Sequence, residues 1–176
     1  MEAKVKISEG VSIEKKGSTL IFKKGQATIQ RTLSNPIIDI KIEKGNVVIS
    51  SKLENRNAKK LVNTFESHIH NMIRGLEKPF VYKMKICSSH FPMSVKVEGE
   101  KVIISNFVGE KKPRFARIIR GAKVEVSKEG IVSISSPDIE AAGLTVGNIE
   151  NATRVTYRDR RILQDGIFII EKPEKK

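Results

Sequence analysis

Four side chains in this sequence could in principle hold a metal ion. Cys87 and His90 have the C-x-x-H spacing of half a zinc site, and the two other histidines, His68 and His70, stand two residues apart. Helix positions two residues apart point to different sides, so this pair is poorly placed to bind one ion. A structural zinc ion needs four ligands, and nothing near Cys87 completes a set. We therefore expect structural or surface histidines, and a cysteine that packs as a small apolar side chain and is no nucleophile.

Acidic side chains are the second group that could support a reaction. Asp138, Glu140 and Asp159 could serve as the metal-binding carboxylates of a nuclease. However, the Ser-Pro-Asp segment 136–138 is typical of a helix start, where Asp138 and Glu140 would meet the positive end of the helix dipole. The sequence also contains no P-loop and no G-x-G-x-x-G segment. We therefore expect no enzyme, no metal and no cofactor.

The chemistry that the sequence does favour is binding of a polyanion. Lys and Arg number 33 against 20 acidic residues, which gives a formal charge of +13. Such a charge is best tolerated when a polyanion neutralises it, and nucleic acid is the first candidate. Seven of the ten arginines lie between Arg114 and Arg161. The candidate RNA-binding residues form two basic segments of the second half, Lys111, Lys112, Arg114, Arg117 and Arg120, and then Arg154, Arg158, Arg160 and Arg161.

The choice of arginine indicates how RNA would be bound. A guanidinium group grips phosphate oxygens in pairs and stacks on bases, whereas an ammonium group is a hydrated point charge. Aromatic residues make up only 5% of the chain, so we expect recognition by RNA shape and backbone and not by aromatic stacking. The alternative interpretation of both segments is a solvated charged surface without a partner.

The remaining composition bears on the cellular compartment. The longest apolar runs, such as 167–170, are far shorter than the about 20 residues that a membrane span needs. Segment 1–11 is charged and lacks the apolar core of a secretory signal. The single cysteine excludes an internal disulfide. We expect a cytoplasmic protein that does not bind membranes.

The elements that must position the basic residues follow from hydrophobic periodicity. In the first half, apolar residues alternate as in β-strands within segments 11–13, 20–22, 38–42 and 47–49. From Asn57 to Leu76 they recur at spacings of three and four, which predicts an amphipathic helix capped by Asn57 and ended by Gly75 and Pro79. Segment 82–86 then predicts a closing strand.

The second half repeats this order. Alternating apolar residues predict strands around 95–97, 102–104, 116–118, 124–126 and 132–134, followed by a helix from about 139 and a last strand over 166–170. Segments 44–50 and 129–135 also resemble each other directly. We therefore predict a duplicated α+β unit, in which each domain has a small antiparallel or mixed sheet and one packed helix. The expected domains are 1–88 and 89–176, and the second is the RNA-binding one.

Several motifs in the chain occur in a fixed order. They are His68-x-x-Asn71-Met72-Ile73-Arg74-Gly75, Tyr82-Lys83-Met84-Lys85, His90-Phe91-Pro92, Asn106-Phe107-Val108-Gly109-Glu110-Lys111 and Asp165-Gly166-Ile167. Together they resemble the family of the universal sixth protein of the large ribosomal subunit, in its archaeal and eukaryotic form. Asp138, Gly143, Asn148 and Ile149 match a helix-start pattern shared with the bacterial branch. Segment 157–163 departs from that branch, which has a segment rich in Pro, Lys and Gly there.

The resemblance implies a tandem fold whose second domain docks on large-subunit ribosomal RNA, close to the factor-binding region that includes the sarcin-ricin loop. It also implies that the two basic segments are the family's basic stretches. We thus expect a structural protein of the large subunit, with ribosomal RNA and neighbouring ribosomal proteins as partners and no self-association. Two alternatives remain, an RNA-binding module of a processing or modification complex and an enzyme acting on RNA.

Overall fold

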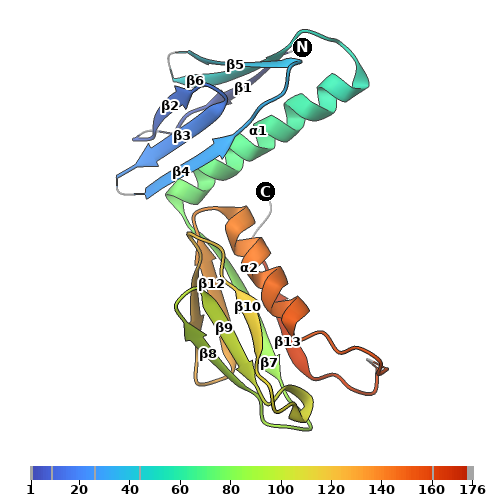
Figure 1. Cartoon of the computed structure of the whole chain (residues 1–176). Coiled ribbons are helices and arrows are strands. Elements are labelled where there is room, and N and C mark those ends of the chain that lie inside the picture. The colour runs from blue at the N-terminus through green and yellow to red at the C-terminus, as the bar shows by residue number, and fades with distance from the viewer. Residues whose placement is uncertain (1, 9, 26, 44, 160, 174–176) are drawn as a thin grey trace. The chain divides into compact units, whose positions relative to one another are not determined.

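The computed structural model describes residues 2–8, 10–25, 27–43, 45–159 and 161–173. The chain divides into two compact units, Met1–Lys78 and Pro79–Lys176, each with antiparallel strands and a long helix (Figure 1). This arrangement confirms the predicted α+β fold with two similar tandem domains. No helix within the described ranges is long and apolar enough to cross a membrane.

The strands of the first unit form two three-stranded antiparallel sheets. The strands are β1 (Glu2–Lys6), β2 (Ser12–Lys16), β3 (Thr19–Lys24), β4 (Ala27–Thr32), β5 (Ile38–Glu43) and β6 (Asn46–Ser51). One sheet is the meander β2-β3-β4, and the other has the order β1-β6-β5. Periodicity in the sequence missed β1 and β4, because each contains only two apolar residues among polar and charged ones.

The helix α1 (Arg56–Glu77) follows the sheets of the first unit. The side chain of Asn55 accepts a hydrogen bond from the backbone N–H three residues later, at 2.8 Å, so Asn55 is the cap and the prediction of Asn57 is wrong. Gly75 lies buried inside the helix and does not end it. Pro79 does, since the residue before a proline avoids the helical conformation and is extended here.

The core of the first unit lies between α1 and both sheets. The helix contacts strands of each sheet, so one apolar stripe covers two sheet faces. The core contains Val62, Phe65, Ile69, Met72, Ile73 and Leu76 from the helix, Val5, Leu20, Phe22, Ile29, Ile40, Val47 and Ile49 from the sheets, and Leu33 from the residue directly after β4. Full burial of one such side chain contributes about 1.5–3 kcal/mol.

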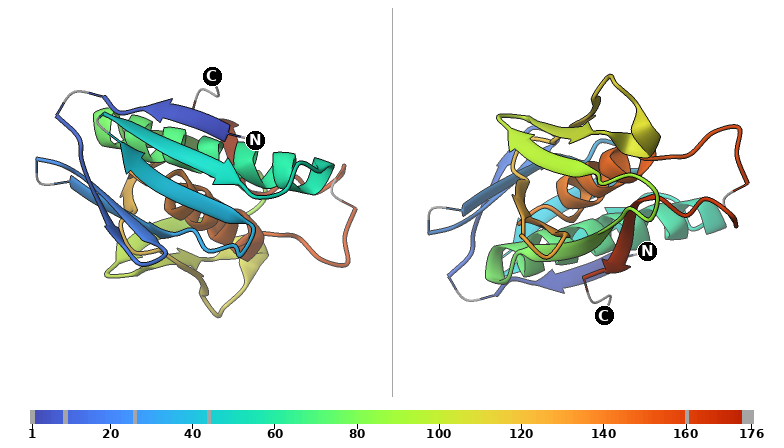
Figure 2. Two further views of the ribbon diagram at one scale, coloured as in Figure 1. Left: turned by 90° about the horizontal axis from the view of Figure 1, so that it is seen from above. Right: turned by 90° about the horizontal axis from the view of Figure 1, so that it is seen from below.

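The second unit has the same parts and one more strand. They are β7 (Phe80–Cys87), β8 (Ser94–Glu98), β9 (Lys101–Ser105), η1 (Phe107–Gly109), β10 (Arg114–Arg117), β11 (Lys123–Val126), β12 (Ile131–Ser136), α2 (Ile139–Ala152) and β13 (Gly166–Glu171). The sheets are the meander β8-β9-β10 and the four-stranded sheet β11-β12-β7-β13. α2 contacts β10 on one side and β12, β7 and β13 on the other, and so lies between the sheets (Figure 2, right).

The predicted start of α2 is confirmed. Asp138 is the cap, and its Oδ1 accepts a hydrogen bond from the backbone N–H of Glu140 at 3.0 Å. The hydroxyl oxygen of Ser136 accepts a further bond from Asp138 N at 3.1 Å. Asp138 and Glu140 are thereby explained as helix-start residues.

The repeat is more regular than periodicity indicates. β7 pairs with β12 as β1 pairs with β6, β11 takes the place of β5, and the meander β8-β9-β10 takes the place of β2-β3-β4. The match of segments 44–50 and 129–135 places β6 on β12, as the topology does. The repeated unit thus opens with a strand and ends with its helix, and β13 is an addition on the free edge of β7.

β7 decides where the chain divides. The sequence interpretation assigns this strand to the end of the first domain, with a boundary at 88/89. In the structure β7 lies between β12 and β13, and the division falls between Lys78 and Pro79, ten residues earlier. The predicted boundary therefore moves, because periodicity identifies a strand but not the sheet that it joins.

We predict that a fragment of residues 79–176 folds, whereas a fragment of residues 89–176 does not. Removal of β7 takes one of the two central strands from the four-stranded sheet, leaves β13 without its neighbour, and takes the fully buried Met84 from the core. A unit this small has little stability in reserve. Circular dichroism and amide NMR spectra of both fragments test this, and a well-folded fragment 89–176 would contradict it.

Candidate RNA interface

The first basic segment runs from the end of η1 through β10. Lys111 and Lys112 are exposed in the loop before the strand. Arg117 is exposed at the end of β10, and the side chain of Arg120, three residues further on, is 91% exposed. Among the described residues, Arg120 has an ion-pair partner in the exposed Glu100, at 4.0 Å, a separation at which a surface ion pair contributes little. These four cations are thus available to a partner.

Arg114 differs from the other residues of this segment. Its Nε donates to Glu110 Oε2 at 2.8 Å, and its Nη2 donates to Oε1 of the same carboxylate. Its Nη1 donates to the backbone carbonyls of Ala152 at 2.9 Å and of Arg154 at 3.2 Å. The guanidinium carbon lies 4.3 Å from the centre of the Phe107 ring. Arg114 therefore braces the unit from within, and we expect it to position the interface without gripping phosphate itself.

The contact with Arg114 changes the pKa of the Glu110 carboxyl group. The hydrogen bond from Arg114 lowers the pKa of Glu110 below its ordinary value. Glu110 is consequently ionised at neutral pH, and its negative charge pairs with the positive charge of Arg114.

Two further polar contacts dock α2 on the free edge of β10. The amide Nδ2 of Asn148 donates to the carbonyl oxygen of Arg117 at 2.9 Å. The hydroxyl oxygen of the buried Thr145 accepts from Ile119 N at 3.1 Å. Together with Arg114, these contacts hold the whole length of β10 against the helix, so the backbone that carries the exposed Arg117 is fixed.

The second basic segment is the loop between α2 and β13. Arg154 and Arg158 are exposed, and Arg160 lies outside the described residues. Arg161 is 90% exposed at its side chain, yet its Nη2 donates to Asp159 Oδ2 at 2.7 Å and its backbone N–H to Asp159 Oδ1 at 2.9 Å. The side-chain bond from Arg161 lowers the pKa of Asp159. Asp159, which could have been a nuclease carboxylate, instead closes this turn.

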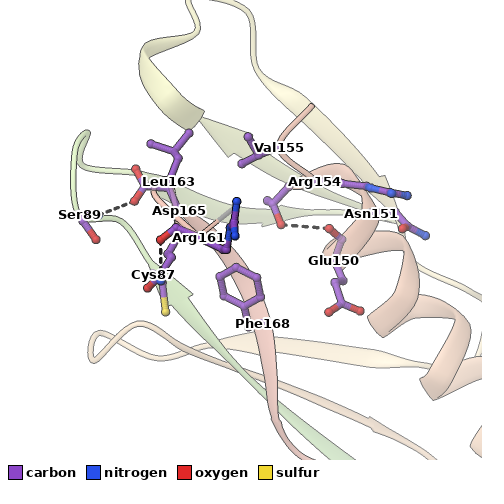
Figure 3. A pocket seen from close by; sticks show the side chains of 12 residues that line it. Cys87, Ser89, Glu150, Asn151, Arg154, Val155, Arg161, Leu163, Asp165 and Phe168 are labelled. Atoms are coloured by element: carbon purple, nitrogen blue, oxygen red, sulfur yellow. Dashed lines mark hydrogen bonds between the residues drawn. The ribbon is translucent and has the colours of Figure 1, made fainter. Parts of the chain in front are cut away.

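The brace brings the two basic segments together. Because Arg114 bonds to the carbonyl of Arg154, the beginning of β10 lies beside the base of the second segment. An open groove of about 920 Å³ adjoins this place and is lined by Arg154 and Arg161 as well as by Cys87, Asp165 and Phe168 (Figure 3). The bases of the two segments thus lie side by side in the second unit, although about 40 residues separate them in the chain.

Asp165 holds the turn directly after β7, at one side of the groove. It is only 3% exposed, and its carboxylate accepts bonds from Ser89 N at 2.9 Å, from His90 N at 3.4 Å and from His90 Nδ1 at 3.2 Å. Burial works to raise the pKa of Asp165, but these hydrogen bonds outweigh it and lower the pKa. The partner of His90 is therefore Asp165 and not Cys87. No group of three metal-ligating side chains occurs among the described residues.

Comparison with known proteins gives the family. No protein-family model matches the chain. The chain is 44% identical to large ribosomal subunit protein uL6 of Methanococcus vannielii, over 97% of this chain and 93% of that protein. The uL6 proteins of Methanosarcina mazei and Methanothrix thermoacetophila are 42% and 45% identical over 96% and 94% of this chain and cover 95% and 94% of those proteins. The chain belongs to the uL6 family.

This membership confirms the family to which the sequence motifs point, and with it a structural, non-enzymatic protein. Three of the motifs meet at one end of the second unit. Asn106 Nδ2 donates to the carbonyl of Pro92 at 2.9 Å, and a Cβ atom at Gly109 would lie 3.2 Å from the Phe91 ring. Asp165 binds the turn that contains His90. The uL6 motifs of this chain thus hold the loops around the basic region.

Sequence reasoning named the exposed cations but could not separate them from Arg114. A signal was present, since Glu110 stands four residues before Arg114. The two carbonyl partners, however, come from a segment about 40 residues away and were not visible in the sequence.

We predict that Arg114→Lys destabilises the second unit by about 1–2 kcal/mol, because one ammonium group cannot serve Glu110 and two carbonyls in the same geometry. Arg120→Lys is the matched control and should leave stability unchanged, since Arg120 is almost fully exposed. Thermal unfolding of both variants measures the difference. Equal melting temperatures would show that Arg114 is no brace.

We also predict that Asp165→Asn destabilises the second unit by about 1–3 kcal/mol at neutral pH. The folded-state pKa of Asp165 lies below its unfolded-state value, so its stabilisation is present above the unfolded-state pKa of about 4 and is lost as the pH falls through the folded-state pKa. Urea unfolding from pH 7 down to pH 3, followed at NMR signals of β12 and β13, should show parent and variant converging in acid. Asp39→Asn, at an exposed site in the first unit, should show no such difference. A constant gap between parent and Asp165→Asn would contradict the assignment.

Proposed function

We propose that the protein is a structural component of the large ribosomal subunit whose second unit binds large-subunit ribosomal RNA. The curated relatives support the first part, since each is named as a large ribosomal subunit protein. The charge of +13 supports the second part. Following the family resemblance, we propose that the contact lies near the factor-binding region that includes the sarcin-ricin loop. Assembly into this particle would make the protein cytoplasmic.

One observation carries the proposal of RNA contact. Arg114 ties the beginning of β10 to the base of the loop after α2, so two distant segments that carry exposed cations lie side by side at this point. The exposed cations of the two segments are Lys111, Lys112, Arg117, Arg120, Arg154, Arg158 and Arg161. Two basic segments held by a rigid sheet and helix can contact two stretches of RNA backbone whose spacing is fixed. Such a surface selects a folded RNA by its shape.

The first unit has a smaller part in this proposal. Only three of the ten arginines, Arg31, Arg56 and Arg74, belong to it. We propose that it serves as a scaffold and meets neighbouring ribosomal proteins, and that the protein does not associate with itself. A module of an RNA-processing complex would carry similar charge but bind other RNAs equally well, so selectivity for ribosomal RNA discriminates between the two functions.

The experiment replaces exposed arginines by lysine. The combined change of Arg120, Arg154 and Arg158 keeps the net charge but removes three guanidinium forks. At about 1 kcal/mol for each fitted contact, affinity for large-subunit ribosomal RNA should fall on the order of a hundredfold, with little change for unrelated RNA. Arg56→Lys in the first unit is the control.

The measurement is a competition titration of large-subunit ribosomal RNA against unrelated RNA. Salt must be held fixed, because affinity falls by about 0.7–0.9 log units per neutralised phosphate for each tenfold rise in salt. Equal affinity of parent and triple variant for ribosomal RNA would show that the surface binds RNA through non-specific charge alone. A parent protein without preference for ribosomal RNA would defeat the proposed function.

A further inference from the structure

The meander β8-β9-β10 of the second unit has an outer face that turns away from the core. Val102, Ile104 and Ala116 are buried on its inner face, so the residues that alternate with them point outward. The register places Phe115 beside Ile103, and Ile103 beside Lys96. In the next row Arg117 lies beside Lys101, and Lys101 beside Glu98. Phe115 is 58% exposed on the edge strand β10 of this outer face.

The duplication provides an internal comparison for this face. The turns between β2 and β3 and between β8 and β9 correspond, with Gly17 and Gly99 both at positive φ. Counted from these turns, the first-unit row Glu14, Ile21 and Gln30 corresponds to Lys96, Ile103 and Phe115. The row Lys16, Thr19 and Thr32 corresponds to Glu98, Lys101 and Arg117. Five of these six positions thus differ in charge or in aromatic character between the units, and only the Ile21/Ile103 position is unchanged.

The outer face of the first meander pairs a cation with an acid and two hydroxyl groups with each other. Lys23 pairs with Glu14 at 2.8 Å, and the hydroxyl groups of Thr19 and Thr32 lie 3.0 Å apart. The outer face of the second meander does not. Its three cations, Lys96, Lys101 and Arg117, outnumber the single acid Glu98, and none of the three forms an ion pair with a described residue. Among the described residues, unpaired positive charge and an exposed aromatic ring therefore coincide on the outer face of the second meander, whereas the corresponding positions of the first meander hold no aromatic residue.

We infer that the outer face of β8-β9-β10 is an additional RNA-binding site that receives a single strand, with one base stacked on Phe115. This inference rests on the proposed function and adds a second kind of contact to it. Lys101 and Arg117 stand in the row beside the ring, where they meet the phosphates of a strand whose base lies over Phe115. Ile103 extends the apolar platform, and Lys96 adds a cation at its far end.

Charge decides the occupant of this face. An RNA strand supplies both an unstacked base for the ring and phosphates for three cations, and sheets with exposed aromatic residues bind RNA in this way. A protein surface that covered the same face would have to supply acids for those cations around an apolar centre. The low overall aromatic content, which argues against stacking in general, does not exclude one ring at one site.

The experiment uses the full-length chain and large-subunit ribosomal RNA purified from Methanosarcina mazei. Phe115→Gln introduces the residue that the first unit has at the corresponding position and should weaken binding about tenfold, as expected for the loss of one stacked base. Phe115→Tyr keeps a ring and should bind like the parent. Gln30→Ala is the matched change on the first meander and should have no effect. Thermal unfolding should be unchanged for all three variants, since both sites are exposed.

Photo-cross-linking with mass spectrometry locates the contact. We expect a nucleotide adduct on Phe115 in the parent. If the parent binds the RNA but Phe115→Gln binds equally well and no adduct forms, this inference fails while the proposed function stands. If Phe115→Gln retains RNA binding but no longer associates with large-subunit proteins, the occupant is a protein and the inference is wrong. A parent that does not bind the RNA would overturn the proposed function itself.

Discussion

The docking of Arg114 against the end of α2 is the interaction on which the basic region of the second unit depends. The last carbonyl groups of a helix have no partner within it and carry partial negative charge, so a cation at this end satisfies both needs. Arg114 bonds to the carbonyl of Ala152, the last residue of α2, and to that of Arg154, two residues beyond the helix, while Glu110 and the Phe107 ring contact its other sides. It joins the start of β10 directly to the beginning of the loop after α2.

Within the part of the chain that the structure describes, the first unit has no equivalent of the contact between Arg114 and the end of α2, as a comparison of the two meanders shows. The register of the two meanders places Ile29 of the first unit where the second has Arg114. Ile29 is buried in the core of the first unit and makes the ordinary apolar contact of a strand with its helix. The same backbone position is thus apolar in one unit and ionic in the other. The exchange costs apolar burial but connects β10 to a loop that the first unit does not have, since there the chain passes directly from α1 into β7.

In the second unit, residues that form internal hydrogen bonds stand next to cations that remain in solvent. Residues that bond within the protein, such as Arg114, Asn148, Asp159 and Asp165, fix the backbone of the loops and the strand edge. The cations beside them keep their charged groups in solvent. A flexible charged surface would attract any polyanion, whereas cations on a fixed backbone favour a partner of matching shape, because less conformational freedom is lost on binding.

The sequence by itself determined the α+β class, the duplication, most strands, both helices and the location of the excess charge, because these depend on local periodicity and composition. It missed β1 and β4, whose apolar residues are too few, and it gave no sign that His90 bonds to Asp165, 75 residues further along the chain. Tertiary structure alone decided that β7 belongs to the second unit, that Arg114 faces inward, and that Phe115 stands beside Arg117 and Lys101 on an open face. Each of these depends on which strand or helix end, distant in the sequence, lies next to the residue in the folded chain. Local periodicity and composition do not reveal such neighbours.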